Sequence, residues 1–326
     1  MANDRAEGPR VAVVGAGGVV GGQLVELIRE RGLSFSTLRT FASPSDESAD
    51  AEGEERDTDA ERLENFRALD DFDLAFLATP AQIASEIAGT RPRATLIDLS
   101  GGCERHVNGS LVAPGFTARQ DLVGLKRRGA IFVTPHPIAT VAATILRALD
   151  VRRGLVSAVG MLGASSFGRR CVDKAISQSA AALNGVLDLA ESETRFAFNL
   201  FPSPARERFQ QMFARQLAAL IGQAPEIAIQ LVQVPVLHGV ALSLCLPPAA
   251  TVDDRRARLR EAPGLLLEEG GPAGLVDVVN QDAVVVSISQ EKPAWIVWCA
   301  FDNARVAALA ALWVAENLAS TDSAER

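Results

Sequence analysis

The stretch RVAVVGAGGVVGGQLVELIRERG, residues 10–32, decides the fold. The apolar run Val11 to Val14 predicts a buried strand, and a glycine-rich turn follows it directly. From Val20 to Ile28 the apolar residues recur at helical spacing, and Gly32 is a suitable helix stop. The stretch therefore predicts a strand, a tight turn and a helix.

Gly15, Gly18 and Gly21 form a GxxGxxG pattern in this turn. Glycine lets the backbone approach a pyrophosphate, and the helix N-terminus offers unpaired N–H groups and a partial positive charge. The pattern indicates dinucleotide binding when it follows a first strand, although a tight turn that binds nothing can share it. We assign to the binding of NAD or NADP the residues Gly15, Gly17, Gly18, Val19, Val20, Ser43, Ser45, Ala78 and Thr79.

The end of the second strand, RTFASPSDES, bears on the choice of cofactor. A 2′-phosphate requires an arginine or lysine there, whereas a free 2′-hydroxyl is bound by aspartate or glutamate. Arg39 lies inside the strand, while Asp46 and Glu47 follow it. The acidic residues favour NAD over NADP.

Further strand-like runs at 35–42, 74–78, 95–99 and 130–133 alternate with helical or loop patterns, which predicts βαβ units and a parallel sheet.

From Leu155 the pattern changes. The runs at 155–162, 282–289 and 294–301 predict strands, 169–189 predicts a long helix, and EIAIQLVQVPVLHGVALSLCL predicts two long adjacent strands broken near His238 and Gly239. The fold class is α/β, with a Rossmann-type parallel-sheet domain (1–137 plus 302–326), an α+β domain (138–301) and a C-terminal helix that packs back on the first domain.

Composition narrows the classes of function. The net charge of −8 comes from the segment Asp46 to Glu64, which has ten acidic residues and two arginines and predicts a solvated loop. No basic stripe suggests nucleic acid as a partner, and no apolar run of membrane-spanning length occurs. The start of the sequence lacks a signal-peptide pattern and the four cysteines are scattered, so we expect a cytoplasmic protein.

Several blocks together resemble a known family. In order along the chain they are VAVVGAGGVVG, LIDLSGG, LVAPGF, VTPHPIATVAATIL, GASSFGRR, AFNLFP, VQVPVLHG and FDNARVAALA. Their order is similar to that of the aspartate-semialdehyde dehydrogenase family, and the resemblance covers the whole chain except the acidic insertion. It implies an oxidoreductase of amino-acid biosynthesis with a Rossmann domain and an α+β dimerisation domain, which assembles as a homodimer. It also implies interconversion of aspartyl phosphate and aspartate semialdehyde with NADP(H), through a cysteine thioester and a histidine acid/base.

The resemblance places two losses at the reactive positions. The family's catalytic turn reads Pro-Asn-Cys-Ser/Thr where this chain has Pro135-His136-Pro137-Ile138, so Pro137 or Ile138 occupies the position of the nucleophile. Neither side chain can form a thioester. In the family's Val-Pro-Val-x-x-Gly-His run, Val240 occupies the histidine position. His238 lies two residues earlier, which in a strand would place it on the same face about 7 Å away.

Three further departures follow from the same resemblance. Gly163 stands where the family has a glutamine, and Glu104 takes the place of the phosphate-binding arginine, with Arg105 next to it. The asparagine that holds the nicotinamide amide becomes Ala310 or Ala311. The losses together indicate that the parent chemistry is absent.

Other candidates for chemistry are few. Cys171 stands at a predicted helix start beside two arginines, where nearby cations favour a thiolate, although a small packing residue is the simpler interpretation. Cys103 receives the same interpretation, and Cys245 and Cys299 are expected in the core. His136 and His238 could approach each other, but two histidines are too few for a metal site, and His106 is expected on a surface loop.

Three functions remain open. The first is a non-catalytic or regulatory homologue, a pseudoenzyme with residual NAD(P) binding that could pair with an active paralogue. The second is an active NAD(P)-dependent semialdehyde dehydrogenase or other oxidoreductase with an altered substrate, in which His136, His238 or Cys171 takes part in catalysis. The third is a binding module that recruits a basic partner through the acidic segment 45–64.

Overall fold

The computed structural model describes residues 8–33, 35–42, 60–186, 194–203, 206–247, 252–291 and 294–322. The chain divides into two compact units, which we call unit 1 (1–136 with 307–326) and unit 2 (137–306). Most of the acidic segment, with Ser43 and Ser45, lies outside the described residues. None of the described helices has the length and apolar character needed to cross a bilayer.

Unit 1 is built on a seven-stranded sheet, sheet A, with the strand order β3-β2-β1-β4-β5-β7-β6. All of its described strand pairs are parallel. The strands are β1 (Arg10–Val14), β2 (Thr37–Ala42), β3 (Glu61–Arg62), β4 (Leu74–Leu77), β5 (Thr95–Asp98), β6 (Gly109–Leu111) and β7 (Ile131–Val133). This arrangement confirms the predicted parallel sheet.

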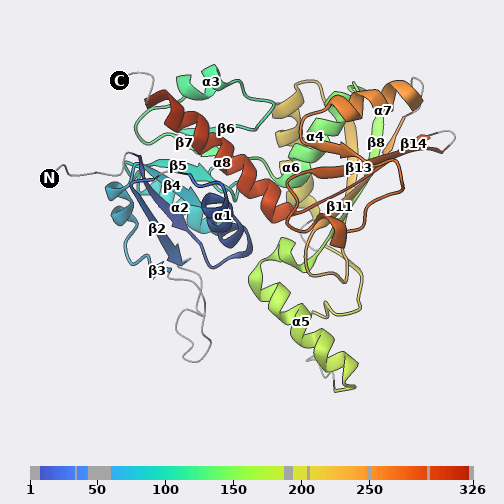
Figure 1. The fold of residues 1–326 in the computed structure, drawn as a ribbon, viewed down its shortest axis with the longest axis horizontal. Coiled ribbons are helices and arrows are strands. Elements are labelled where there is room, and N and C mark those ends of the chain that lie inside the picture. The colour runs from blue at the N-terminus through green and yellow to red at the C-terminus, as the bar shows by residue number, and fades with distance from the viewer. Residues whose placement is uncertain are drawn as a thin grey trace. The chain divides into compact units, whose positions relative to one another are not determined.

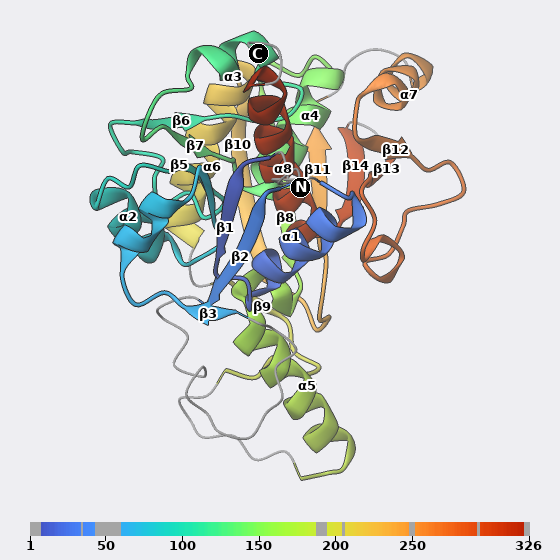
Figure 2. The ribbon, with the colours of Figure 1, turned by 60° about the vertical axis from the view of Figure 1, so that its left-hand side comes forward.

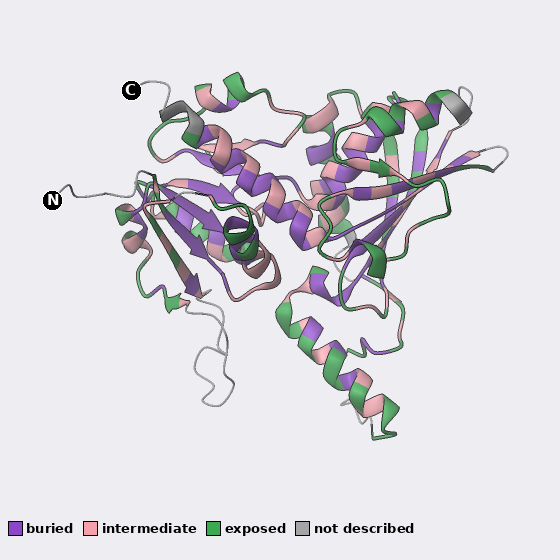
Figure 3. Cartoon of the chain, in the orientation of Figure 1, coloured by how far each residue is buried: buried purple, intermediate pink, exposed green. Residues whose placement is uncertain are grey.

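The core of unit 1 lies on both faces of sheet A. Val11 and Val13 of β1 belong to a cluster that includes α1 (Val19–Glu30) and α8 (Asn303–Asp322). Ala12 and Val14 point to the opposite cluster, which includes α2 (Ala81–Gly89). Figures 1 and 2 show α1 and α8 along one face of the sheet, and Figure 3 shows how completely its central strands are buried. Two-sided burial explains the uninterrupted apolar run that predicted β1, and the position of α8 confirms the returning C-terminal helix.

The remaining helices of unit 1 are short. The 3₁₀ helix η2 (Phe66–Asp71) precedes β4, and α3 (Arg119–Gly124) precedes β7. The last residues of the acidic segment form β3 rather than a loop, since Glu61 and Arg62 pair with the end of β2. The prediction of a solvated loop is therefore wrong for this end of the segment.

Unit 2 contains a second seven-stranded sheet, sheet B, with the order β12-β13-β14-β11-β8-β10-β9. Its strands run in both directions, as the α+β prediction requires. They are β8 (Leu155–Leu162), β9 (Phe201–Pro202), β10 (Glu226–Gln233), β11 (Val240–Leu246), β12 (Leu265–Leu267), β13 (Val284–Glu291) and β14 (Ala294–Phe301).

Two expectations for unit 2 are wrong. The strands β10 and β11 are not neighbours, because β8 lies between them, parallel to β10 and antiparallel to β11. The helix expected over 169–189 ends earlier, since α5 is Arg169–Leu183 and a turn follows it. The first error concerns strand pairing, which depends on residues far apart in the sequence. The second concerns the end of a helix, which sequence patterns locate only to within a few residues.

Helices cover one face of sheet B. The helices α4 (Pro137–Ala148), α6 (Arg206–Ile221) and α7 (Val252–Glu261) belong to this layer, and α4 packs against α6. Burial alternates along β8, with Val156, Ala158 and Leu162 inside and Leu155 61% exposed on the other face. Among the residues that the structure describes, sheet B therefore has one face packed by helices and another face whose side chains along β8 are exposed or partly exposed.

Candidate functional site

The glycine turn lies at the point where the strand order of sheet A reverses. The turn follows β1, and β2 and β4 flank β1 on its two sides. The backbone N–H groups of Gly15 and Ala16 donate to the carbonyl oxygen of Phe41 in β2, at 2.8 and 3.0 Å. In open α/β sheets, ligands bind at such a reversal beyond the carboxyl ends of the strands. The predicted cofactor residues of the turn therefore occupy the expected position.

The turn is closed so tightly at Gly15 and Gly21 that these two positions exclude a side chain. Gly15 has a φ of +87°, and a Cβ there would lie 2.5 Å from the carbonyl oxygen of Ala78. A Cβ at Gly21 would lie 2.1 Å from the carbonyl oxygen of Gly15. Gly18 is the N-cap residue of α1 and leaves the helix start without a side chain above it. The result is a bare backbone surface at a helix N-terminus, which suits a pyrophosphate.

Thr79 supplies a polar group beside this surface. Its side chain is only 5% exposed, and its Oγ1 has no hydrogen-bond partner among the residues that the structure describes. Its Cγ2 lies 3.3 Å from the position of a Cβ built on Gly15, so the hydroxyl belongs to the same turn. A buried hydroxyl without a partner costs free energy unless a ligand or water satisfies it. The glycine cradle and this hydroxyl together fit a dinucleotide.

Arg39 is the cationic side chain of β2, the strand that leads to the predicted ribose position. It forms an ion pair with Glu61 of β3, with 3.0 Å between its Nε and a carboxylate oxygen. The pair raises the pKa of the Arg39 guanidinium and lowers the pKa of the Glu61 carboxyl, mainly through their hydrogen bonds. The guanidinium also lies 5.2 Å from the ring centre of Phe41. Arg39 is therefore already engaged.

The start of α4 contains no nucleophile. Pro137 is the first helical residue, where its missing N–H and fixed φ are well tolerated. Ile138 is completely buried, so neither residue presents a reactive atom. His136 precedes the helix, and burial lowers the pKa of its imidazole to about 4. His136 is consequently neutral at pH 7.

The position of Gly163 is closed by backbone. The N–H groups of Gly163, Ala164 and Ser165 donate to the carbonyl oxygens of the turn 236–239, at 2.8 to 3.0 Å. A Cβ at Gly163 would lie 2.9 Å from the carbonyl oxygen of Gly239 and 3.0 Å from the carbonyl carbon of His238. A longer side chain at this position would require the turn to move.

His238 does not share a face with Val240. Gly239 has a φ of +89° and interrupts the strand, so His238 lies in a turn before β11. Val240 is 1% exposed, whereas His238 is exposed. The expectation that the two residues point the same way along one strand is therefore wrong.

None of the four cysteines replaces the missing nucleophile at the start of α4. Burial raises the pKa of Cys171, and Lys174 only partly opposes this, so a thiolate is not favoured there. Burial also raises the pKa of Cys103 and brings that of Cys299 to about 12. The thiols of Cys103 and Cys299 donate to the carbonyl oxygens of Ala84 and Leu242. Cys245 lies in β11 and is partly buried.

The resemblance also singled out residues of α8 and of the loop after β5, and the structure shows how far each of them is buried. Ala310 and Ala311 are buried in α8, and Ala311 belongs to the core of unit 1. Arg105 is exposed and Glu104 is partly buried. No group of three or more histidine, cysteine or acidic side chains within the described ranges could hold a metal ion.

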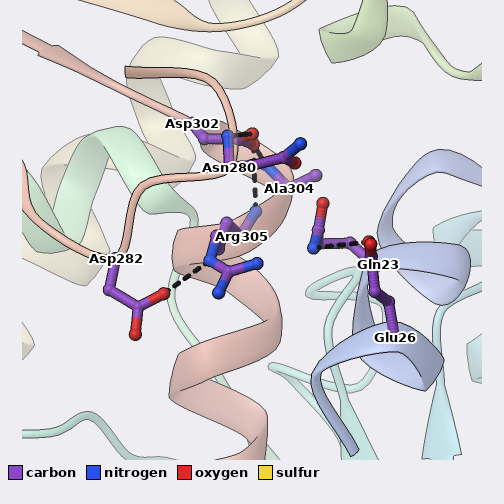
Figure 4. Close-up of polar contacts among 7 residues, drawn as sticks. All are labelled: Gln23, Glu26, Asn280, Asp282, Asp302, Ala304 and Arg305. Carbon is purple, nitrogen blue, oxygen red and sulfur yellow. Dashed lines mark hydrogen bonds and ion pairs between the residues drawn. The ribbon is translucent and has the colours of Figure 1, made fainter. Parts of the chain in front are cut away.

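The motif FDNARVAALA contains a residue whose role the sequence analysis missed. Asp302 is 5% exposed, and one carboxylate oxygen accepts from the N–H groups of Ala304 and Arg305, at 3.0 and 3.1 Å (Figure 4). Its other oxygen accepts from the N–H of Asn280, at 3.0 Å. An aspartate directly before an apolar helix is an N-cap signal, so the sequence contained the information. Asp302 fixes the start of α8 to the loop at 280.

Comparison with known proteins agrees with this geometry. The family model described as "Semialdehyde dehydrogenase, NAD binding domain" matches residues 10–121. A USG-1 protein homolog from Azotobacter vinelandii is 28% identical, covering 94% of this chain and 97% of that protein. An aspartate-semialdehyde dehydrogenase from Rickettsia conorii is 24% identical, with the same coverage of 94% and 97%. The structure of a probable aspartate-semialdehyde dehydrogenase from Pseudomonas aeruginosa superposes with a TM-score of 0.81 at 26% identity, covering 96% of this chain and 98% of that one.

The two-sheet fold and the glycine turn at the strand reversal accompany a semialdehyde dehydrogenase NAD binding domain, which the family model places at residues 10–121. Its relatives match over nearly the whole chain and not only over the NAD binding domain. The resemblance of the sequence blocks to aspartate-semialdehyde dehydrogenases is therefore confirmed over nearly the whole chain.

Proposed function

We propose that this chain is a family member that binds a nicotinamide dinucleotide but does not carry out the parent thioester reaction. The observation that supports this most directly is the start of α4, where Pro137 and the buried Ile138 offer no thiol. A regulatory or scaffolding role, alone or with an active paralogue, follows from this proposal.

The dinucleotide part of the proposal rests on the residues of unit 1. The N-terminus of α1 would hold the pyrophosphate, with the bare backbone of Gly15 and Gly18 allowing close approach. The Thr79 hydroxyl would gain the hydrogen bond that it lacks. A bound nicotinamide would supply a hydride donor or acceptor.

The preferred cofactor in this proposal is NAD. A 2′-phosphate needs an arginine with free donors, but Glu61 occupies Arg39, the cation of β2. Glu61 would also repel a phosphate at that position, because both are anions. NADP is therefore the weaker ligand.

Calorimetry with NAD, NADH, NADP and NADPH on the purified chain tests the binding part. We expect NAD or NADH to bind more tightly than their phosphorylated counterparts. The Gly18→Asp variant is the matched control: aspartate is a favourable N-cap residue but puts a negative charge beside the pyrophosphate. Wild-type protein that binds none of the four, or a Gly18→Asp variant that binds as well as wild type, would refute the cofactor site.

Turnover of aspartate semialdehyde with phosphate and either cofactor tests the catalytic part. Loss of a nucleophile removes on the order of a millionfold in rate in an unrelated protease, so we expect no measurable rate. Appreciable turnover in the wild-type protein would overturn the non-catalytic proposal and leave the cofactor proposal standing.

The alternative function is an oxidoreductase with another substrate. Hydride transfer to a carbonyl needs a bound cofactor and an acid/base group, but no thioester. His238 favours this alternative, because its exposed imidazole lies on the turn next to Gly163. A scan of aldehydes and ketones with NADH, repeated on His238→Gln, tests it, and activity lost in the variant would support it.

A homodimer is the proposed assembly. One face of sheet B is not covered by helices, and side chains such as Leu155 and Met161 are exposed or partly exposed on it. Light scattering on the wild type and on Leu155→Asp tests this proposal. A wild type that is monomeric at micromolar concentration would refute it.

A further inference from the structure

Unit 1 contains a cavity that no part of the proposed function uses. Its volume is about 380 Å³, and its apolar floor includes Ala88, Leu96 and Ile131. Leu96 and Ile131 stand at the amino ends of β5 and β7. The glycine turn follows the carboxyl end of β1, and all of these strands are parallel. The cavity and the glycine turn therefore lie at opposite edges of sheet A.

The rim of this cavity is basic. Arg67, Arg91, Arg93 and Arg128 line it, and none of its lining residues is acidic. Asp70 lies 3.8 Å from the guanidinium of Arg67 and accepts from the backbone N–H of Arg93. Within the described part of the chain, no carboxylate pairs with the guanidinium groups of Arg91, Arg93 or Arg128.

This concentration of cations lies in a chain whose net charge is −8. Like charges that converge on one cavity repel one another, and no described carboxylate compensates three of them. Arginines near the carboxyl end of α2 would be favoured by the helix dipole, which accounts for Arg91 and Arg93. It does not account for Arg67 and Arg128, which reach the same cavity from η2 and from the loop before β7.

Arg91 adopts a backbone conformation that costs free energy. Its φ is +53°, just beyond the end of α2, where glycine or asparagine is the usual residue. An arginine at this position gives up backbone stability that a glycine would keep, and the helix dipole returns only part of it.

His106 and Asn108 add hydrogen-bonding groups to the wall. The Nδ1 atom of His106 accepts from the backbone N–H of Asn108, at 3.2 Å. A neutral imidazole in this arrangement carries its proton on Nε2, which leaves a donor for a ligand. Asn108 in turn accepts from Arg127 and donates to the carbonyl oxygen of Gly129, at 3.3 and 3.5 Å, and so ties the wall together.

We propose that this cavity binds a small phosphorylated molecule, with the phosphoryl group on the guanidinium groups and the remainder of the molecule against the apolar floor. Arginine forks match phosphate oxygens in a bidentate manner, and several of them together favour a group with more than one negative charge. The ligand would bind independently of the dinucleotide, which makes the cavity a site for an effector.

Calorimetry with inorganic pyrophosphate and with AMP tests the proposal, with citrate as the carboxylate probe and ionic strength held constant. The background is the Gly18→Asp variant, so that the glycine turn does not contribute. We expect pyrophosphate and AMP to bind and citrate to bind more weakly. In Arg91→Gln/Arg128→Gln the phosphate affinity should fall about 100-fold, roughly tenfold for each charge-assisted contact removed.

Two sets of variants separate this site from general charge effects and from folding. Arg208→Gln/Arg256→Gln removes two exposed arginines of unit 2 and should leave the affinity within about twofold. Arg91→Lys/Arg128→Lys keeps the charge but loses the fork and should give an intermediate affinity. Arg91→Gly should raise the melting temperature, because it relieves the positive φ, and still weaken pyrophosphate binding.

Three results would overturn the proposal. One is the absence of binding by both pyrophosphate and AMP. Another is an equal loss of affinity in the Arg208→Gln/Arg256→Gln control, which would indicate nonspecific attraction. The third is citrate binding as tightly as pyrophosphate, which would mean that the cavity does not select a phosphoryl group.

Discussion

The glycine turn of unit 1 and the edge of sheet B at Gly163 both exclude a side chain, but they differ in what lies beyond the glycine. At the turn, a Cβ on Gly15 or Gly21 would collide with backbone, yet the surface beyond stays bare and the Thr79 hydroxyl stays unsatisfied. At Gly163, the space for a side chain is filled by the backbone of the turn 236–239. The first region has the features of a kept binding surface and the second those of a closed one. The difference shows that backbone can close one position to side chains and leave a bare surface at another position of the same chain.

The largest effect should come from Gly21→Ala in the glycine turn. The new Cβ would lie 2.1 Å from the carbonyl oxygen of Gly15, so strand and helix must separate. We expect a loss of about 3 kcal/mol in the free energy of unfolding, measured in urea, together with loss of dinucleotide binding.

Gly22→Ala is the matched control one residue further on. Its Cβ would be 3.6 Å from the carbonyl oxygen of Ala16, an ordinary contact. It should stabilise the helix by up to about 1 kcal/mol. Equal effects of the two alanines would show that the turn is not closed by backbone.

The next effect concerns His136, the residue before α4, whose imidazole we expect to be neutral and packed rather than to act as an acid/base group. Burial lowers its pKa to about 4 in the folded chain, against about 6.5 when unfolded. Above pH 6.5 both states are neutral, and as the pH falls from 6.5 towards 4 only the unfolded state takes up the proton. Stability should therefore fall over that range by up to about 3 kcal/mol.

Urea unfolding of the wild type and of His136→Gln between pH 4 and 7 checks this. The wild type should lose more stability than the variant over this range. Parallel pH profiles would mean that His136 titrates normally, and it would then be a credible acid/base group again.

A somewhat smaller effect should follow from Gly163→Ala. The Cβ would meet the backbone of His238 and Gly239 at 2.9 to 3.1 Å, and backbone cannot move aside cheaply. We expect a loss of about 2 kcal/mol. In Gly160→Ala the nearest atom is the end of the flexible Leu231 side chain, at 2.7 Å, so the loss should be under about 1 kcal/mol.

The same closed space predicts that Pro137→Cys combined with Val240→His does not restore turnover. Both reactive groups would then be present beside an edge of the sheet that has no room for a further side chain. If Gly163→Ala leaves the free energy of unfolding unchanged, the backbone does not close this edge of sheet B, and the contrast with the glycine turn no longer holds.

The smallest effect has opposite signs for stability and for binding. Thr79→Val keeps the shape but removes a buried hydroxyl without a partner, which should stabilise the free protein by about 1 kcal/mol. The same change should weaken NAD binding about tenfold if the hydroxyl bonds the cofactor. Unchanged affinity in calorimetry would remove Thr79 from the site.

Local patterns in the sequence predicted much of the fold. The runs at 155–162 and 294–301 match β8 and β14, because apolar strands buried by their neighbours have a strong local signature. The helix α6 was missed, although Phe209, Phe213 and Leu217 recur at helical spacing. The insertion of β8 between β10 and β11 could not be predicted, because strand pairing depends on distant residues.

The site was predictable only in part, for the same reason. The GxxGxxG pattern is local, so the turn and its helix could be placed from the sequence. The closure at Gly163 depends on a turn some 75 residues later, and the basic cavity depends on the register that brings Arg67, Arg91 and Arg128 together. Charges scattered along a sequence carry no sign of such convergence.

The ion pair between Arg39 and Glu61 has a consequence for engineering. A change of cofactor preference usually requires a new cation, but here the cation already exists in β2 and is restrained by one carboxylate on the neighbouring strand. Removing that carboxylate with Glu61→Gln would release a guanidinium instead of introducing one. In the proposed site, cofactor preference would be set by a removable restraint, and a single exchange on a two-residue strand would reverse it.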